Sequence, residues 1–171
     1  LVSGLVASGA DAYMLHVIPT PGVAHQTVEG CFDCGIMISA SHNPYTDNGI
    51  KLLNSAGEKM EQSVIDEIEN YLDGNLEIPF ATGANIGRTQ DYSAGRNRYI
   101  GYLISLSTHS YKGMKVGLDC ANGSTWMMAK NIFDALGADT YVIGNEPDGT
   151  NINRDCGSVS YTHLRAHETS Q

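Results

Sequence analysis

The sequence predicts an α/β protein built from short buried strands and amphipathic helices. Three apolar runs bounded by turn residues, at positions 35–39, 49–54 and 115–119, have the length and composition of buried strands. Between residues 61 and 73, apolar side chains recur on one helical face. Residues 115–143 repeat the order strand, helix, strand, which is the βαβ unit of α/β proteins.

The first thirty residues predict a helix, a strand and a second helix. Residues 1–10 resemble the end of an amphipathic helix that is closed by Gly9. Residues 11–18 are predicted as a strand, which must end at the two prolines that follow because proline cannot continue a hydrogen-bonded ladder. Residues 23–29 are predicted as a short helix that leads to the strand at 35–39.

The middle of the chain predicts two more helices. The helix at 61–73 ends at Gly74, and its apolar face consists of Val64, Ile65, Ile68 and Leu72. Residues 75–87 are predicted as a polar connection. Asp91 is then expected to cap a helix that reaches residue 107, with a tyrosine stripe that belongs to a core or an interface.

The remainder of the chain predicts the opening of a second domain. Residues 110–113 are interpreted as a boundary, so that residues 1–110 form a first domain and residues 111–157 begin another. Within the second region, a helix at 124–136 separates the strands at 115–119 and 139–143.

Composition excludes several classes of partner. The chain has 171 residues, 42% of them apolar, and a net charge of −9. Nucleic acid and anionic membrane surfaces require clusters of Lys and Arg, so neither is expected to bind. No apolar run reaches the roughly 20 residues of a membrane span. A structural zinc site needs four ligands, and no second pair at zinc spacing accompanies Cys31 and Cys34. We therefore expect reduced thiols in a cytoplasmic protein.

The loop after the strand at 35–39 carries the polar side chains with the clearest chemistry. Residues 39–43 read Ser-Ala-Ser-His-Asn, and Pro44 and Gly49 are turn signals that follow. In open α/β sheets, ligands bind at the carboxyl ends of strands. The sequence therefore predicts a binding site in this loop.

Two strings in this loop, Ser-Ala-Ser-His-Asn-Pro and Asp-Asn-Gly-Ile-Lys, resemble the active-site loop of the α-D-phosphohexomutases. The second string is most similar to the bacterial phosphoglucosamine mutases. The resemblance covers residues 1–157, because the strings at 119–123 and 146–153 are similar to the opening of the second domain of these enzymes. It implies a mixed sheet sandwiched by helices, here as a truncated first domain followed by the opening βαβ unit of a second.

The resemblance also implies a mechanism. Ser41 would be the phosphorylated residue and would bind Mg²⁺ through its phosphate, while His42 and Lys51 would help to neutralise the transferred group. The parent enzyme would interconvert glucosamine 6-phosphate and glucosamine 1-phosphate through a bisphosphate. His42 could equally serve to hold the loop by hydrogen bonding, and the Lys51 amine could simply end in water.

Other readings stay open from the residues alone. A phosphomannomutase or phosphoglucomutase would share this loop, because the resemblance places sugar recognition in a third domain. A non-catalytic α/β binding piece, with redox pairing of Cys31 and Cys34, is the alternative from another class.

The family pattern also implies elements that this sequence lacks. An Asp-rich metal loop, a sugar-recognition loop and a phosphate clamp are absent, and Leu1 lies inside a predicted helix. We therefore expect a piece of a longer chain, inactive by itself, whose parent could be a homodimer. Residues 158–171 leave the family pattern and resemble translated adapter sequence, so we expect an unrelated tail without function.

Overall fold

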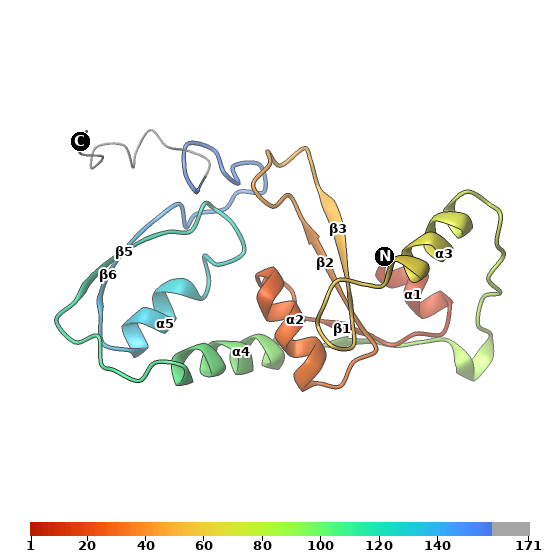
Figure 1. Cartoon of the computed structure of the whole chain (residues 1–171), viewed down its shortest axis with the longest axis horizontal. Helices are drawn as coiled ribbons and strands as arrows, with labels where there is room; N and C mark the ends of the chain where they lie inside the picture. The colour runs from red at the N-terminus through yellow and green to blue at the C-terminus, as the bar shows by residue number, and fades with distance from the viewer. Residues whose placement is uncertain (159–171) are drawn as a thin grey trace.

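A computed structural model describes residues 1–158 and confirms the α/β class. The helices and strands follow one another in the order α1 (Val2–Ala7), β1 (Ala12–Met14), α2 (Thr20–Glu29), β2 (Cys34–Ser39), β3 (Gly49–Asn54), α3 (Gln62–Leu72), a short 3₁₀ helix (Gly83–Asn85), β4 (Thr89–Asp91), α4 (Ser93–Ser105), β5 (Lys115–Asp119), α5 (Ala129–Ala135) and β6 (Asp139–Ile143). Figure 1 shows β5, β6 and α5 at one end of the molecule, α1 and α3 at the other, and α2 and α4 between them.

The strands of the described residues pair two by two. β1 and β4 are parallel, β2 and β3 are antiparallel, and β5 and β6 are parallel. In the β2–β3 hairpin, Ser39 lies opposite Gly49 and Met37 lies opposite Lys51. The loop at residues 40–48 therefore emerges from the open end of a regular hairpin, at a position that the strand register determines.

The segment between β1 and α2 differs from the prediction. β1 ends at Met14 rather than near Ile18, and His16 has a φ of 59°, which interrupts an extended strand. α2 begins at Thr20, three residues earlier than expected, with Pro21 in its first turn. Proline fits there because the first N–H groups of a helix need no intrahelical acceptor.

The connection before α4 contains a strand that the sequence pattern did not reveal. β4 pairs with β1, and its register is extended by a hydrogen bond from the Tyr92 N–H to the Met14 carbonyl at 2.9 Å. Asp91 lies at the end of β4 and its Oδ1 accepts the Ser93 N–H at 2.8 Å. The prediction that Asp91 is the N-cap is wrong, because the N-cap is Tyr92. Asp91 lies one position earlier and accepts the N–H of the first helical residue.

One core joins both halves of the chain. Its buried members come from the segment before α2, from α2, β3 and α4, and from the turn before α5; they are Ile18, Val23, Leu53, Tyr99 and Met128. Tyr99 confirms that the tyrosine stripe belongs to a core. These residues lie on both sides of position 110, so the two predicted regions pack on each other.

α3 forms as the helical pattern predicts, but it contributes no buried residue. Val64 and Ile68 are each 37% exposed, and Leu72 is 74% exposed. α5 is shorter than predicted, because residues 124–128 form turns. No helix within residues 1–158 combines the length and apolar character needed to cross a bilayer.

Candidate active site

The serine loop, which we define as residues 40–48, is positioned by close packing of α2 on β2. Gly35 is buried in β2, and a Cβ at this position would collide with the Thr27 hydroxyl and lie 3.1 Å from a Val23 methyl group. Thr27 is itself fastened by a hydrogen bond from its Oγ1 to the Val23 carbonyl at 2.8 Å. Glycine thus lets the helix approach the strand, and the strand carries the loop outward from this contact.

Ser41 lies in the serine loop with its side chain exposed. Its backbone N–H donates to Ser39 Oγ at 2.9 Å, and its φ is 56°. The left-handed conformation is uncommon for a residue with a side chain, and such residues concentrate at functional sites. Ala40, immediately before it, is only 5% exposed, so the loop is buried at its base while Ser41 is exposed.

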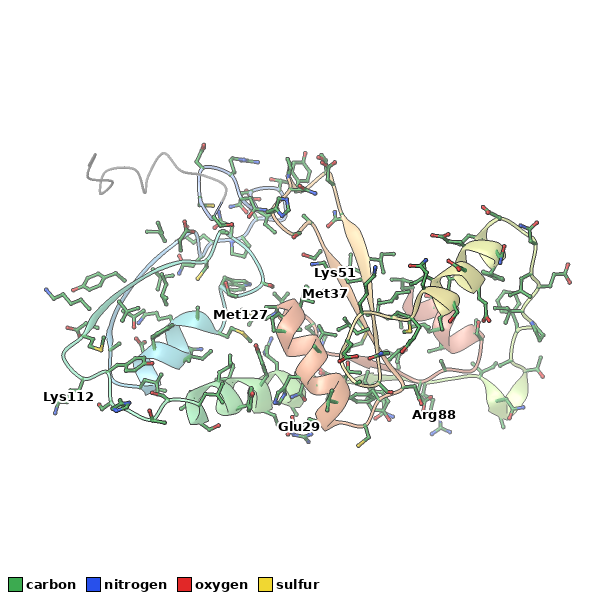
Figure 2. All side chains as sticks on the ribbon, in the orientation of Figure 1. Glu29, Met37, Lys51, Arg88, Lys112 and Met127 are labelled. Carbon is green, nitrogen blue, oxygen red and sulfur yellow. The ribbon has the colours of Figure 1, made fainter. Side chains whose placement is uncertain are left out.

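The structure brings two of the three predicted site residues together. Ser41 Oγ lies 3.4 Å from His42 Nδ1, at the outer limit of a hydrogen bond. Lys51 is exposed on β3 opposite Met37, as Figure 2 shows. Within residues 1–158 no hydrogen bond or ion pair joins Lys51 to Ser41. Lys51 therefore lies on the strand that leaves the loop, two register positions from its open end.

Asn153 is a site residue that the sequence did not identify. Its Nδ2 donates to the carbonyl of Ser41 at 3.0 Å and to the carbonyl of Asn43 at 2.9 Å. Figure 1 shows the segment that precedes residue 158 beside the open end of the β2–β3 hairpin. The string at 146–153 carries the family resemblance, but no local pattern can reveal a contact across 112 residues of chain.

The residues of the described chain do not by themselves form a magnesium site. No group of three His, Cys, Asp or Glu side chains within residues 1–158 could hold a metal ion. Mg²⁺ requires several oxygen ligands in near-octahedral geometry. A phosphate on Ser41 could contribute oxygen ligands, but the other protein ligands are not among these residues.

One thiol of the Cys31–Cys34 pair lies in an environment that disfavours its reactive form. Cys31 and Cys34 are free thiols, and Cys120 and Cys156 are free and buried. Desolvation of its sulfur and the negative charge of Asp33 raise the pKa of Cys34. A redox-active cysteine needs the opposite shift, because the thiolate is the reactive form. The environment of Cys34 therefore gives the redox alternative no support.

Comparisons with known proteins match this chain to phosphohexomutases. Residues 1–78 match the family model described as phosphoglucomutase/phosphomannomutase, alpha/beta/alpha domain I. A phosphoglucosamine mutase of Lachnospira eligens is 66% identical over 165 residues, which are 96% of this chain and 36% of the relative. Another phosphoglucosamine mutase, from Lachnoclostridium phytofermentans, is 62% identical over 172 residues, which cover 100% of this chain and 38% of the relative.

Two solved structures share the fold. A phosphoglucomutase/phosphomannomutase family protein from Burkholderia thailandensis aligns with a TM-score of 0.69 and 23% identity, over 86% of this chain and 32% of that one. A serine-to-alanine variant of an N-acetylphosphoglucosamine mutase from Aspergillus fumigatus, in complex with glucose 1,6-bisphosphate, aligns with a TM-score of 0.51 and 18% identity, over 92% of this chain and 43% of that one. At these identities the likeness shows the fold alone.

The chain spans little more than a third of the length of these curated relatives. The match to the Lachnoclostridium phytofermentans protein extends over the whole chain, so the matched length includes the serine loop and the segment that holds Asn153. These matches and the α/β fold together show that the chain belongs to the phosphohexomutase family.

Proposed function

We propose that the whole protein is a phosphoglucosamine mutase that interconverts glucosamine 6-phosphate and glucosamine 1-phosphate, with Ser41 as the phosphoryl carrier. The single observation that carries this proposal is the conformation of Ser41, which is exposed and has left-handed backbone. Hydrogen bonds to Ser39 and from Asn153 hold its N–H and its carbonyl. The names of the relatives at 66% and 62% identity support the choice of substrate.

The proposed reaction uses Ser41 twice. Phosphorylated Ser41 gives its phosphoryl group to the free hydroxyl of the sugar phosphate. The bond from phosphorus to Ser41 Oγ breaks, a bond from phosphorus to the sugar oxygen forms, and the hydroxyl proton ends on Ser41 Oγ. The resulting bisphosphate then returns the other phosphoryl group to Ser41 and leaves as the isomeric sugar phosphate. In such a transfer the protein mainly positions the reacting groups and neutralises the charge on the phosphoryl group.

His42 and Lys51 are proposed to assist at the phosphoryl group. His42 Nδ1 lies near Ser41 Oγ, so the ring can hydrogen-bond to this oxygen or to a phosphate on it. Lys51 is exposed on the adjacent strand, where its flexible amine adds positive charge to the side of the hairpin. The chain carries a net charge of −9, so local positive charge is needed to hold an anionic sugar.

The proposal for the whole enzyme includes Mg²⁺ bound in part through the phosphate of Ser41. When bound, the ion would neutralise charge on the phosphoryl group. Since residues 1–158 lack a cluster of ligands, we expect no turnover from this chain alone. We place the enzyme in the cytoplasm, where thiols stay reduced, which agrees with the four free cysteines within residues 1–158. We expect no nucleic-acid partner, and we propose a homodimer, which sedimentation of the whole enzyme would test.

The decisive experiment compares the whole enzyme with its Ser41→Ala variant. Phosphopeptide mass spectrometry is expected to find phosphate on Ser41 of the wild type, and Ser41→Ala is expected to lose all measurable turnover of glucosamine 6-phosphate. Ser63→Ala, on the exposed surface of α3, is the matched control and should retain wild-type activity. Full activity of Ser41→Ala would refute the proposal. In the same assay, Lys51→Met should lower kcat while Ser41 remains phosphorylated.

A phosphomannomutase or phosphoglucomutase is the second candidate, which the description of the matching family model favours. Both candidates use the same serine loop, so the geometry around Ser41 does not separate them. Assays of the whole enzyme with glucosamine 6-phosphate, mannose 6-phosphate and glucose 6-phosphate would do so. The primary proposal expects the highest kcat/KM for the amino sugar.

A further inference from the structure

The side chain of Asn153, which lies outside the β2–β3 hairpin, forms hydrogen bonds to the serine loop. Asn153 Nδ2 has two hydrogens, and it donates to the carbonyls of Ser41 and Asn43 at 3.0 Å and 2.9 Å. These carbonyls lie on either side of His42. The single amide of Asn153 therefore restrains the backbone on both sides of His42, the residue that follows Ser41.

The other hydrogen bonds that shape the serine loop are local. Ser41 N–H donates to Ser39 Oγ, Asn43 N–H donates to the Ala40 carbonyl at 2.9 Å, and Asp47 N–H donates to the Pro44 carbonyl at 3.0 Å. Within residues 1–158, the hydrogen bonds that reach this loop from outside the hairpin both come from Asn153. A left-handed serine is disfavoured by about 1–3 kcal/mol, and such strain persists only where the surroundings hold it.

Asn153 is itself held rigidly by the turn after β5. Its backbone N–H donates to the Ala121 carbonyl at 2.9 Å, and its own φ is 59°, a conformation that asparagine tolerates well. The two carboxylate oxygens of Asp119 accept the N–H groups of Ala121 at 2.9 Å and Gly157 at 2.7 Å. This carboxylate joins the turn after β5 to the segment that carries Asn153.

Gly157 completes this support. Its φ is 83°, and a Cβ there would lie 2.8 Å from the Ala121 Cβ and 3.3 Å from Asn153 Oδ1. The side-chain amide of Asn122 adds a further tie, because its Nδ2 donates to the Asn151 carbonyl at 3.3 Å. These contacts hold the backbone of Asn153 at a position from which its side-chain amide reaches the serine loop.

We propose that Asn153 is a positioning residue, through which the opening of the second region sets the conformation and hence the phosphoryl-transfer rate of Ser41. This inference rests on the proposed function for its kinetic part. Asn153 touches backbone carbonyls and not the reacting atoms, so it acts on the orientation of Ser41 Oγ. Small displacements of a reacting group lower rates steeply, by as much as about 100-fold for 1 Å.

The test uses the whole enzyme and two substitutions of Asn153 that differ in backbone preference and in side-chain chemistry. Asn153→Gly removes the amide but adopts a positive φ freely, and Asn153→Asp keeps the shape while turning a carboxylate toward two carbonyl oxygens. Asn75→Asp, at an exposed position before the 3₁₀ helix, makes the same chemical change elsewhere and serves as the control. For each protein one measures kcat, KM, the melting temperature and hydrogen–deuterium exchange in peptides that cover residues 40–48.

Both variants at Asn153 are expected to lower kcat by about 10-fold or more, with KM close to that of the wild type. They should also accelerate exchange in the serine loop, whereas Asn75→Asp changes neither quantity. A purely structural role of residue 153 would be satisfied by Asn153→Gly. Wild-type kcat in that variant, or unchanged exchange in residues 40–48, would therefore overturn the inference.

The outcome also separates this inference from the proposed function. If Ser41→Ala stays fully active, the mutase assignment is wrong, while the exchange data still report whether Asn153 restrains the loop. If Ser41→Ala is inactive and Asn153→Gly keeps its kcat, the mutase assignment stands and the role of Asn153 is wrong.

Discussion

At the scale of single residues, five of the residues with left-handed backbone lie in the serine loop or in the segments of the second region that support it. Ser41, Ala121, Asn122, Asn153 and Asp155 all have φ between 49° and 59°. Most side chains avoid this conformation, so each of these residues needs support from its neighbours. The hydrogen bonds from Asn153 to the serine loop provide that support on one side, and the carboxylate of Asp119 provides it on the other.

Asp91 allows a residue-scale prediction about pH. Hydrogen bonds from the backbone and side chain of Ser93, and more weakly the neighbouring His16, lower the pKa of Asp91. A lowered pKa in the folded state means that the charged carboxylate stabilises the fold above its unfolded pKa of about 4, and that this stability is lost as the pH falls further.

Asp91→Asn should therefore be less stable than the wild type at pH 7, and the difference should shrink as the pH falls from about 4 through the lowered pKa of folded Asp91. Asparagine keeps an oxygen that can accept the Ser93 N–H, so the substitution removes mainly the charge. Melting temperatures of the two proteins between pH 2 and 7, followed by circular dichroism, measure this effect. A difference that does not change with pH would contradict it.

At the scale of elements, the contact between α2 and β2 decides where the serine loop begins. Gly35 leaves no space for a side chain, because Thr27 and Val23 of α2 lie directly against it. Ile38 and Ile50, near the open end of the hairpin, are each 58% exposed. α2 thus covers the hairpin near Gly35 and leaves these apolar side chains close to the loop uncovered.

Gly35→Ala should destabilise the chain by about 1–3 kcal/mol, the usual cost of forcing an extra carbon into a packed contact. Gly49→Ala, in the partner strand, is the matched control, because the nearest atom to its added Cβ would be the Ser39 carbonyl oxygen at 3.8 Å. Urea unfolding of both variants gives the comparison. Equal stability of the two would show that α2 yields at Gly35 without cost.

At the scale of the whole molecule, one shared core connects the two regions. Met128, before α5, is 2% exposed and belongs to the same cluster as Ile18, Val23, Leu53 and Tyr99. The Asn153 contact closes a second connection between the regions, at the serine loop. A core that crosses the predicted boundary should make both regions unfold together.

Met128→Ala is accordingly expected to cost about 2–5 kcal/mol, as truncation of a buried methionine does, and to leave a single unfolding transition. Met114→Ala, at a side chain that is 53% exposed, should change stability little. Thermal unfolding, together with hydrogen exchange in β2–β3 and in β5–β6, tests the coupling. Two separated transitions, with only β5–β6 weakened by Met128→Ala, would show that the regions unfold independently.

Local patterns were sufficient to predict the α/β class, the strands Gly49–Asn54, Lys115–Asp119 and Asp139–Ile143, and the exposed serine loop between two of the strands. These features depend on periodicity and on turn residues, which are written in adjacent positions. Only the tertiary structure shows that β4 pairs with β1 and that Asn153 forms hydrogen bonds to the serine loop. β4 is three exposed residues long and the Asn153 contact crosses 112 positions, so neither leaves a periodic signal. Such contacts follow from the packing of distant elements around a common core.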